Sequence, residues 1–95
     1  MTIRHFFAFF LTSGLRFKNT WTKFYDNSNI LKEYAYFKTQ TQRKPNGHLQ
    51  IGFNNDTQDV LTCTYTPIGG ETTEFKSIEE VAEYFGTKLA FSYKN

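Results

Sequence analysis

Cysteine, histidine and proline are scarce in this chain of 95 residues. A single cysteine, Cys63, cannot form an intramolecular disulfide, so the sequence does not fit the small disulfide-rich scaffolds of secreted proteins. Two histidines and one cysteine are too few for a recognisable zinc site. We therefore expect no metal, no cofactor and a reducing, intracellular location in the cytoplasm or nucleus.

Long apolar runs and catalytic motifs are also missing. The apolar run at residues 5–11 is interrupted by His5, is far shorter than the ~20 residues of a membrane-spanning helix, and precedes no A-x-A cleavage site. We expect neither a signal peptide nor a membrane partner. The sequence has no nucleophile elbow, phosphate-binding loop or pair of catalytic carboxylates, so we expect no enzyme and assign no catalytic residue.

Aromatic residues are abundant: eleven Phe, six Tyr and one Trp make up 19% of the chain. Each buried ring removes about 150–250 Å² of surface from water. A few rings can therefore supply much of the core of a small protein, and we expect residues 1–95 to form a single domain.

Residues 31–75 predict an antiparallel meander. Alternating apolar and polar residues mark strands at 31–40, 48–54, 60–66 and 72–75, and Asn46-Gly47 between the first two is a typical hairpin signal. Short connections between consecutive strands indicate antiparallel pairing. The alternation places Leu31, Ala35 and Phe37 on one face of the first strand, opposite the polar face described below. It places Leu49, Ile51 and Phe53 together on one face of the second strand, and it predicts that Leu61, Cys63 and Tyr65 of the third point inward.

The C-terminal part of the chain predicts a short helix at about 77–85 that packs on one face of the sheet. Ser77 and Glu80 have the spacing of a capping box. Apolar residues recur at helical spacing between 78 and 85, and Gly86 can adopt the left-handed conformation that ends a helix. Phe91 and Tyr93 then alternate with polar residues, as expected of a final strand or an extended tail.

The N-terminal third is less regular. Residues 3–11 fit either a helix or a buried strand, because phenylalanines cover most of a helical surface there. Residues 15–18 alternate, whereas Trp21, Phe24 and Tyr25 follow at a helix-like spacing. The predicted fold is α+β, with a meander of about four to five strands, the C-terminal helix and an N-terminal aromatic segment.

Charge is unevenly distributed, although the formal net charge is only +2. Residues 1–48 contain eight basic and two acidic residues, whereas residues 49–95 contain three basic and seven acidic ones. Such asymmetry either steers an anionic partner to one face or lets the two halves attract each other in the fold or in a dimer.

A basic and aromatic surface is the clearest candidate site. Ammonium and guanidinium groups neutralise phosphates, tyrosine rings stack on bases, and a hairpin tip can enter a groove. The alternative is that the two tyrosines are buried under residues 3–11. The candidate contacts on the first predicted strand and its hairpin tip are Lys32, Tyr34, Tyr36, Lys38, Arg43, Lys44 and Asn46.

Residues 65–86, YTPIGGETTEFKSIEEVAEYFG, resemble the last part of methyl-CpG-binding domains, whose plan of three strands and a helix is shared by plant AP2 domains. The aromatic tail extends the resemblance to residue 93. The resemblance implies contact with DNA, with Lys76 standing where the family has one of its two guanine-reading arginines, although lysine lacks the bidentate fork of arginine. The matching residues are Pro67, Gly69, Phe75, Ser77, Val81, Tyr84 and Phe85.

Two functions therefore stay open. The first is a small non-enzymatic protein that binds DNA or RNA through a basic and aromatic sheet face and a hairpin tip. The second is a phage- or virus-type inhibitor or adaptor that binds a host protein. Homodimerisation through the N-terminal phenylalanines is compatible with both.

Overall fold

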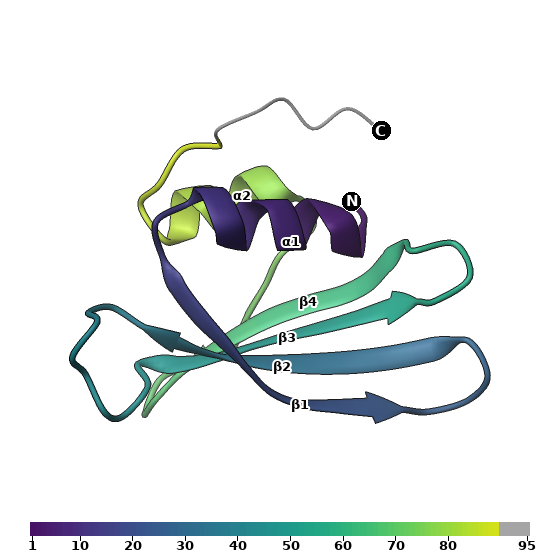
Figure 1. Cartoon of the computed structure of the whole chain (residues 1–95), viewed down its shortest axis with the longest axis horizontal. Coiled ribbons are helices and arrows are strands. Elements are labelled where there is room, and N and C mark those ends of the chain that lie inside the picture. Colours follow the sequence, from purple (N-terminus) through teal and green to yellow (C-terminus); the bar gives the residue numbers. More distant parts are fainter. Residues whose placement is uncertain (90–95) are drawn as a thin grey trace.

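The computed structural model describes residues 1–89, so the predicted tail at Phe91 and Tyr93 lies outside the described residues. Five strands form one antiparallel sheet in chain order, β1-β2-β3-β4-β5, which does not close into a barrel. Both helices lie on the same side of the sheet (Figure 1). The predicted α+β meander is confirmed. The elements are α1 (Ile3–Thr12), β1 (Arg16–Phe24), β2 (Asn29–Phe37), β3 (Gly47–Asn54), β4 (Val60–Pro67), β5 (Thr73–Glu74) and α2 (Ile78–Tyr84).

The N-terminal aromatic segment is a helix rather than a strand. Thr2 and His5 form a capping box, in which Thr2 Oγ1 accepts from the His5 N–H at 3.4 Å and His5 Nδ1 accepts from the Thr2 N–H at 3.2 Å. Ile3, Phe6 and Phe9 recur at helical spacing and are buried. Two of the N-terminal phenylalanines are therefore inside the molecule and cannot form a dimer surface.

The C-terminal helix lies where the sequence predicts it. Ser77 Oγ accepts from the Glu80 N–H at 3.2 Å, as expected of an N-cap. The return bond differs from a capping box, because Glu80 Oε1 accepts from the backbone N–H of Lys76 at 3.2 Å. Gly86, with φ of +69°, adopts the predicted left-handed conformation just after the helix.

The core lies between the two helices and the sheet. Leu49, Ile51 and Cys63 from the middle of the sheet are fully buried, which confirms the inward position predicted for Cys63. Phe85, just after α2, packs its ring at 4.9 Å from that of Tyr65, between ring centroids, and at 5.2 Å from that of Phe17 on β1. Aromatic rings therefore connect both ends of the chain to the sheet.

Two β-bulges break the alternation that the sequence shows. In β1 the register shifts between Asn19 and Trp21, which leaves Thr20 as the extra residue and explains the helix-like spacing of the aromatic residues that follow. In β4 the register shifts opposite Gly52 and Phe53, so that Leu61 is the extra residue. Leu61 is 60% exposed, which corrects its predicted inward position. None of the helices within residues 1–89 is long and apolar enough to span a membrane.

Candidate nucleic-acid interface

The face of the sheet opposite the helices, here called the open face, is built from rows of side chains that cross the strands. Residues directly opposite each other in antiparallel strands point to the same side of the sheet. β1 contributes cations and a tryptophan to these rows, and β4 contributes a column of threonines. The rows are Arg16–Phe37; Lys18–Ala35–His48–Thr66; Trp21–Glu33–Gln50–Thr64–Glu74; and Lys23–Leu31–Gly52–Thr62.

The bulge in β1 brings Trp21 onto the open face. Regular alternation from Lys18 would place Trp21 on the helix side, and the extra residue Thr20 shifts the phase by one. Thr20 Oγ1 donates to the Glu33 carboxylate at 2.9 Å, and Gln50 Nε2 donates to it at 3.1 Å. Trp21 remains 38% exposed beside this fixed carboxylate. A half-exposed indole on a sheet face is a platform on which a planar group can stack.

Arg16 connects the start of β1 to the loop at residues 38–46, here called the β2–β3 loop. Its guanidinium carbon lies 4.4 Å from the centroid of the Phe37 ring, and its Nη1 donates to the carbonyl of Gln40 at 3.1 Å. Phe37 is consequently buried although it belongs to the open face. The loop and β1 therefore present one joined surface.

The β2–β3 loop exposes Lys38, Arg43 and Lys44 to solvent. Asn46 holds the loop in shape, because its Oδ1 accepts from the Lys38 N–H at 3.0 Å and also from the side-chain amide of Gln42. The hairpin that Asn46-Gly47 indicates does form between β2 and β3, with Asn46 as the last residue of the loop and Gly47 as the first residue of β3. The side-chain oxygen of Asn46 is thus engaged within the loop, whereas the three cations point outward as candidate contacts.

Tyr34 and Tyr36 lie on the helix side, which corrects their expected role in stacking on bases. Tyr34 is 5% exposed, and its ring centroid lies 4.7 Å from that of Phe10 on α1. Tyr36 is partly buried, with its ring centroid 4.7 Å from that of Phe85. Burial raises the pKa of Tyr34 to about 12 and raises that of Tyr36 as well. Both rings belong to the core, as in the alternative considered for them.

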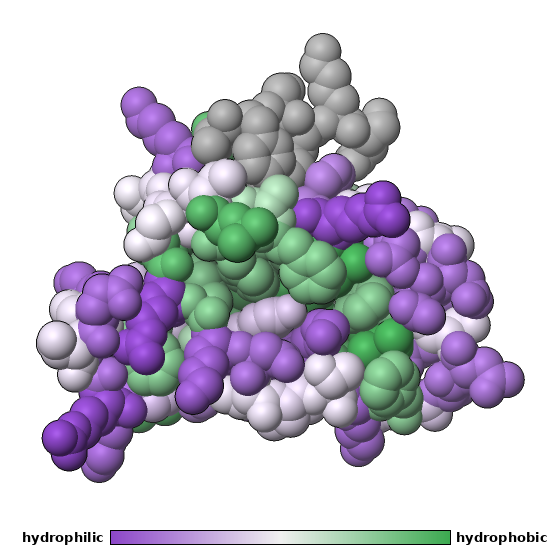
Figure 2. Space-filling view, viewed as in Figure 1, coloured by the Kyte–Doolittle hydropathy of each residue, from purple (hydrophilic) through white to green (hydrophobic). Residues whose placement is uncertain are grey.

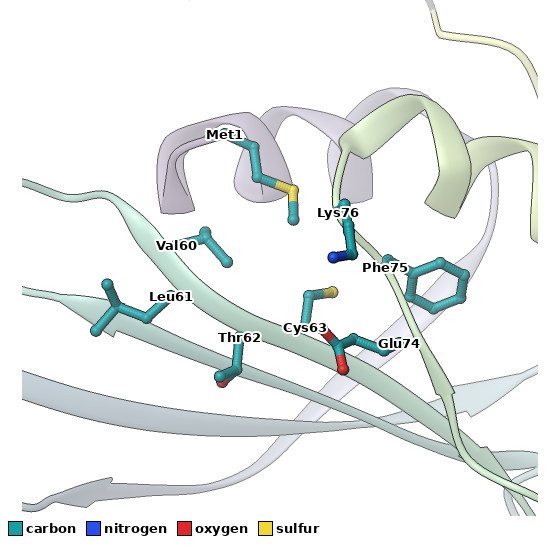
Figure 3. Close-up of a pocket in the computed structure, with 8 residues that line it drawn as sticks. All are labelled: Met1, Val60, Leu61, Thr62, Cys63, Glu74, Phe75 and Lys76. Atoms are coloured by element: carbon teal, nitrogen blue, oxygen red, sulfur yellow. The ribbon is translucent and has the colours of Figure 1, made fainter.

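Lys32 and Lys76 also lie apart from the β2–β3 loop. Lys32 is on the helix side of β2, where its Nζ donates to Thr22 Oγ1 of β1 at 3.3 Å. Lys76 lies between β5 and α2 and lines a cavity of about 250 Å³ together with Met1 and Cys63 (Figure 3). The structure therefore does not bring these two lysines to the other predicted contacts.

The cavity beside Lys76 holds its one thiol, that of Cys63, in the protonated form. Figure 3 shows Cys63 at its centre, on β4, with the Met1 side chain above it. Burial raises the pKa of the Cys63 thiol to about 12, so the thiol stays protonated at neutral pH. Within residues 1–89, no group of three or more His, Cys, Asp and Glu side chains is placed to hold a metal ion.

Opposite charges gather at the two ends of the sheet. The cluster here called the basic end, Arg16, Lys18, Lys38, Arg43 and Lys44, lies where β1 begins and β2 ends. The cluster here called the acidic end, Asp26, Asp56 and Asp59, lies in the turns that join β1 to β2 and β3 to β4. The two turns are joined by a hydrogen bond of 2.6 Å from Ser28 Oγ to Asp56 Oδ2. Figure 1 shows these turns at one end of the sheet and the β2–β3 loop at the other.

The residues that sequence reasoning missed are Arg16, Lys18 and Trp21 on β1. The alternation of Arg16 and Lys18 with apolar neighbours is visible in the sequence and places both on one strand face. The bulge at Thr20 hides the continuation of that face to Trp21. No family model, curated protein or solved structure matches the chain.

Proposed function

We propose that this chain is a small non-enzymatic protein that binds nucleic acid, with a single strand lying over the open face and its phosphates at the basic end. The observation that carries the proposal is the continuity of the basic end with exposed Trp21 on the uncovered side of the sheet. Cations release condensed counterions when they neutralise phosphates, and an aromatic ring stacks on any base.

The acidic residues limit where the phosphates can lie. Glu33 and Glu74 share a row of the open face with Trp21, so the middle of that face repels phosphates. The glutamates of α2 lie on the helix side. The bound single-stranded nucleic acid therefore runs along β1 and the β2–β3 loop, where Lys18, Arg43 and Lys44 face solvent.

A titration of labelled oligonucleotides, followed by fluorescence anisotropy at two salt concentrations, tests this proposal. The double variant Arg43→Glu/Lys44→Glu removes two exposed cations from the basic end. We expect it to bind a single-stranded oligonucleotide at least tenfold more weakly than the wild type. The slope of the logarithm of the association constant against the logarithm of the salt concentration should be smaller in magnitude by about 1.4, for two lost phosphate contacts. A duplex of the same sequence should bind more weakly than the single strand, because its bases are not free to stack on Trp21.

The matched control is Arg4→Glu/Lys76→Glu, which makes the same change in net charge at two exposed positions, one on α1 and one between β5 and α2. It should change the affinity by less than threefold. A wild-type protein with no affinity at low salt rules the proposal out, and so does an equal loss of affinity in the two double variants.

A further inference from the structure

An apolar pocket opens at the acidic end. Its volume is about 270 Å³, and Tyr25, Leu31, Phe53 and Leu61 are among the residues that line it. Gly52 and Thr62 also form part of the lining. Leu61 and Tyr25 are exposed although both are large and apolar. The pocket is therefore suited to receive an apolar side chain from another molecule.

The two turns that adjoin this pocket carry three carboxylates. The Asp26 carboxylate accepts from the backbone N–H groups of Ser28 and Asn29 at 2.8 Å each, which lowers its pKa and keeps it charged. Asp56 and Asp59 lie in the neighbouring turn. One cation, Lys23, also lies here, with its Nζ 5.0 Å from the centroid of the Tyr25 ring. The carboxylates of these turns therefore favour an apolar side chain that is flanked by several positive charges.

The opposite end of the same molecule carries that chemistry. Ile68 lies in the turn between β4 and β5 and is 65% exposed. Its backbone N–H donates to the carbonyl of Asn46 at 2.8 Å, which places it against the β2–β3 loop with its lysines and arginine. The turn that holds Ile68 also holds the acidic residue Glu71. The positive charges beside Ile68 therefore belong to the β2–β3 loop and not to its own turn.

We propose that this chain associates head to tail with further copies of itself, with Ile68 and the β2–β3 loop of one copy in the apolar pocket at the acidic end of the next. Like ends repel each other, so a symmetric contact between two acidic ends or two basic ends is disfavoured. A contact between unlike patches leaves one free patch at each end of a pair, so further copies can add until the rotation between copies closes a ring. The contact is small and is expected to be weak and strongly dependent on salt.

The association is tested by measuring the weight-average mass of the full chain by light scattering across a dilution series. For the wild type at low salt, the mass should rise with protein concentration beyond that of two chains. It should fall back to that of one chain at about 1 M salt, where the Debye length is about 3 Å. Ile68→Asp and Leu61→Asp should each stay monomeric, with an association constant at least tenfold lower. Both positions are exposed, so neither change disturbs the core.

Mixing the two variants distinguishes head-to-tail association from every symmetric contact. Ile68→Asp keeps an intact pocket and Leu61→Asp keeps an intact Ile68, so an equimolar mixture should form complexes of two chains and no larger species. The matched control is Leu11→Asp, which changes an 86% exposed leucine on α1 and should associate like the wild type. A monomeric wild type at high concentration and low salt overturns the proposal. A mixture that stays monomeric, or a loss of association in Leu11→Asp, does so equally.

Discussion

At the scale of single residues, burial divides the aromatic side chains into those that build the core and those that face a partner. Tyr34 packs against Phe10 inside the molecule, whereas Trp21 is half-exposed on the open face. The sequence alone cannot separate these roles, because both faces of β2 carry apolar side chains. Tyr34 faces α1, and Ala35 and Phe37 are buried on the other side.

Replacing Tyr34 by alanine tests this division. Tyr34→Ala removes a buried ring and should lower the free energy of unfolding by about 3–5 kcal/mol, as for other large aromatic residues in cores. Trp21→Ala should lower it by about 1 kcal/mol or less, since the indole is only half-buried, yet it should weaken binding to single strands. Urea unfolding of both variants measures the difference. Equal losses of stability would contradict the assigned positions.

Three buried side chains with titratable protons make the free energy of unfolding depend on pH in the alkaline range. Burial raises the pKa values of Tyr34, Cys63 and Tyr65 to about 12, from ordinary values of 10.0 for tyrosine and 9.0 for cysteine. The unfolded chain therefore loses these protons at lower pH than the folded chain does, and unfolding releases protons in this range. Their contribution to stability is complete below about pH 9 and is lost as the pH rises to about 12.

The free energy of unfolding, measured by denaturant titration at a series of pH values, should therefore stay level near pH 8 and fall steeply between about pH 9 and pH 12. Cys63→Ala removes the group that titrates first, and the fall should then begin nearer to pH 10. Stability that does not change up to pH 12 would contradict the burial of these groups.

At the scale of secondary-structure elements, local sequence signals predict helices and turns better than they predict which face of a strand points into the core. Ser77, the apolar stripe after it and Gly86 predict α2 because capping and helical spacing act within a few residues. The bulges at Thr20 and Leu61 depend on pairing with distant strands, so the alternation in the sequence misplaces both Trp21 and Leu61. The candidate site was therefore predicted only at the β2–β3 loop.

Two glycines of β3 test how closely the strands approach each other. At Gly47, a Cβ atom would lie 2.6 Å from the carbonyl oxygen of Thr66, a backbone atom that cannot move aside without disturbing the sheet. Gly47→Ala should cost about 1–3 kcal/mol of stability through overpacking. At Gly52 the obstacle is the hydroxyl of Thr62, which can rotate away, so Gly52→Ala should cost clearly less. Thermal or urea unfolding of the pair decides between this order and its reverse.

At the scale of the whole molecule, the sheet separates an open face from a covered one and a basic end from an acidic end. Figure 2 shows the apolar surface over α1 and the neighbouring strands, with hydrophilic side chains towards both ends of the sheet. The uneven charge in the sequence predicted part of the separation between the basic end and the acidic end. The placement of Arg16 and Lys18 beside the β2–β3 loop arises from the antiparallel pairing of β1 with β2, which joins residues about twenty positions apart.

The most direct test of the open face as a nucleic-acid interface uses its own tryptophan. Trp21 is the single tryptophan of the chain, so its fluorescence reports on the open face alone. Titration with an unlabelled single-stranded oligonucleotide at low salt should quench this emission in a saturable way, and added salt should restore it. Unchanged Trp21 emission, in a sample whose anisotropy shows that the oligonucleotide is bound, would contradict the account.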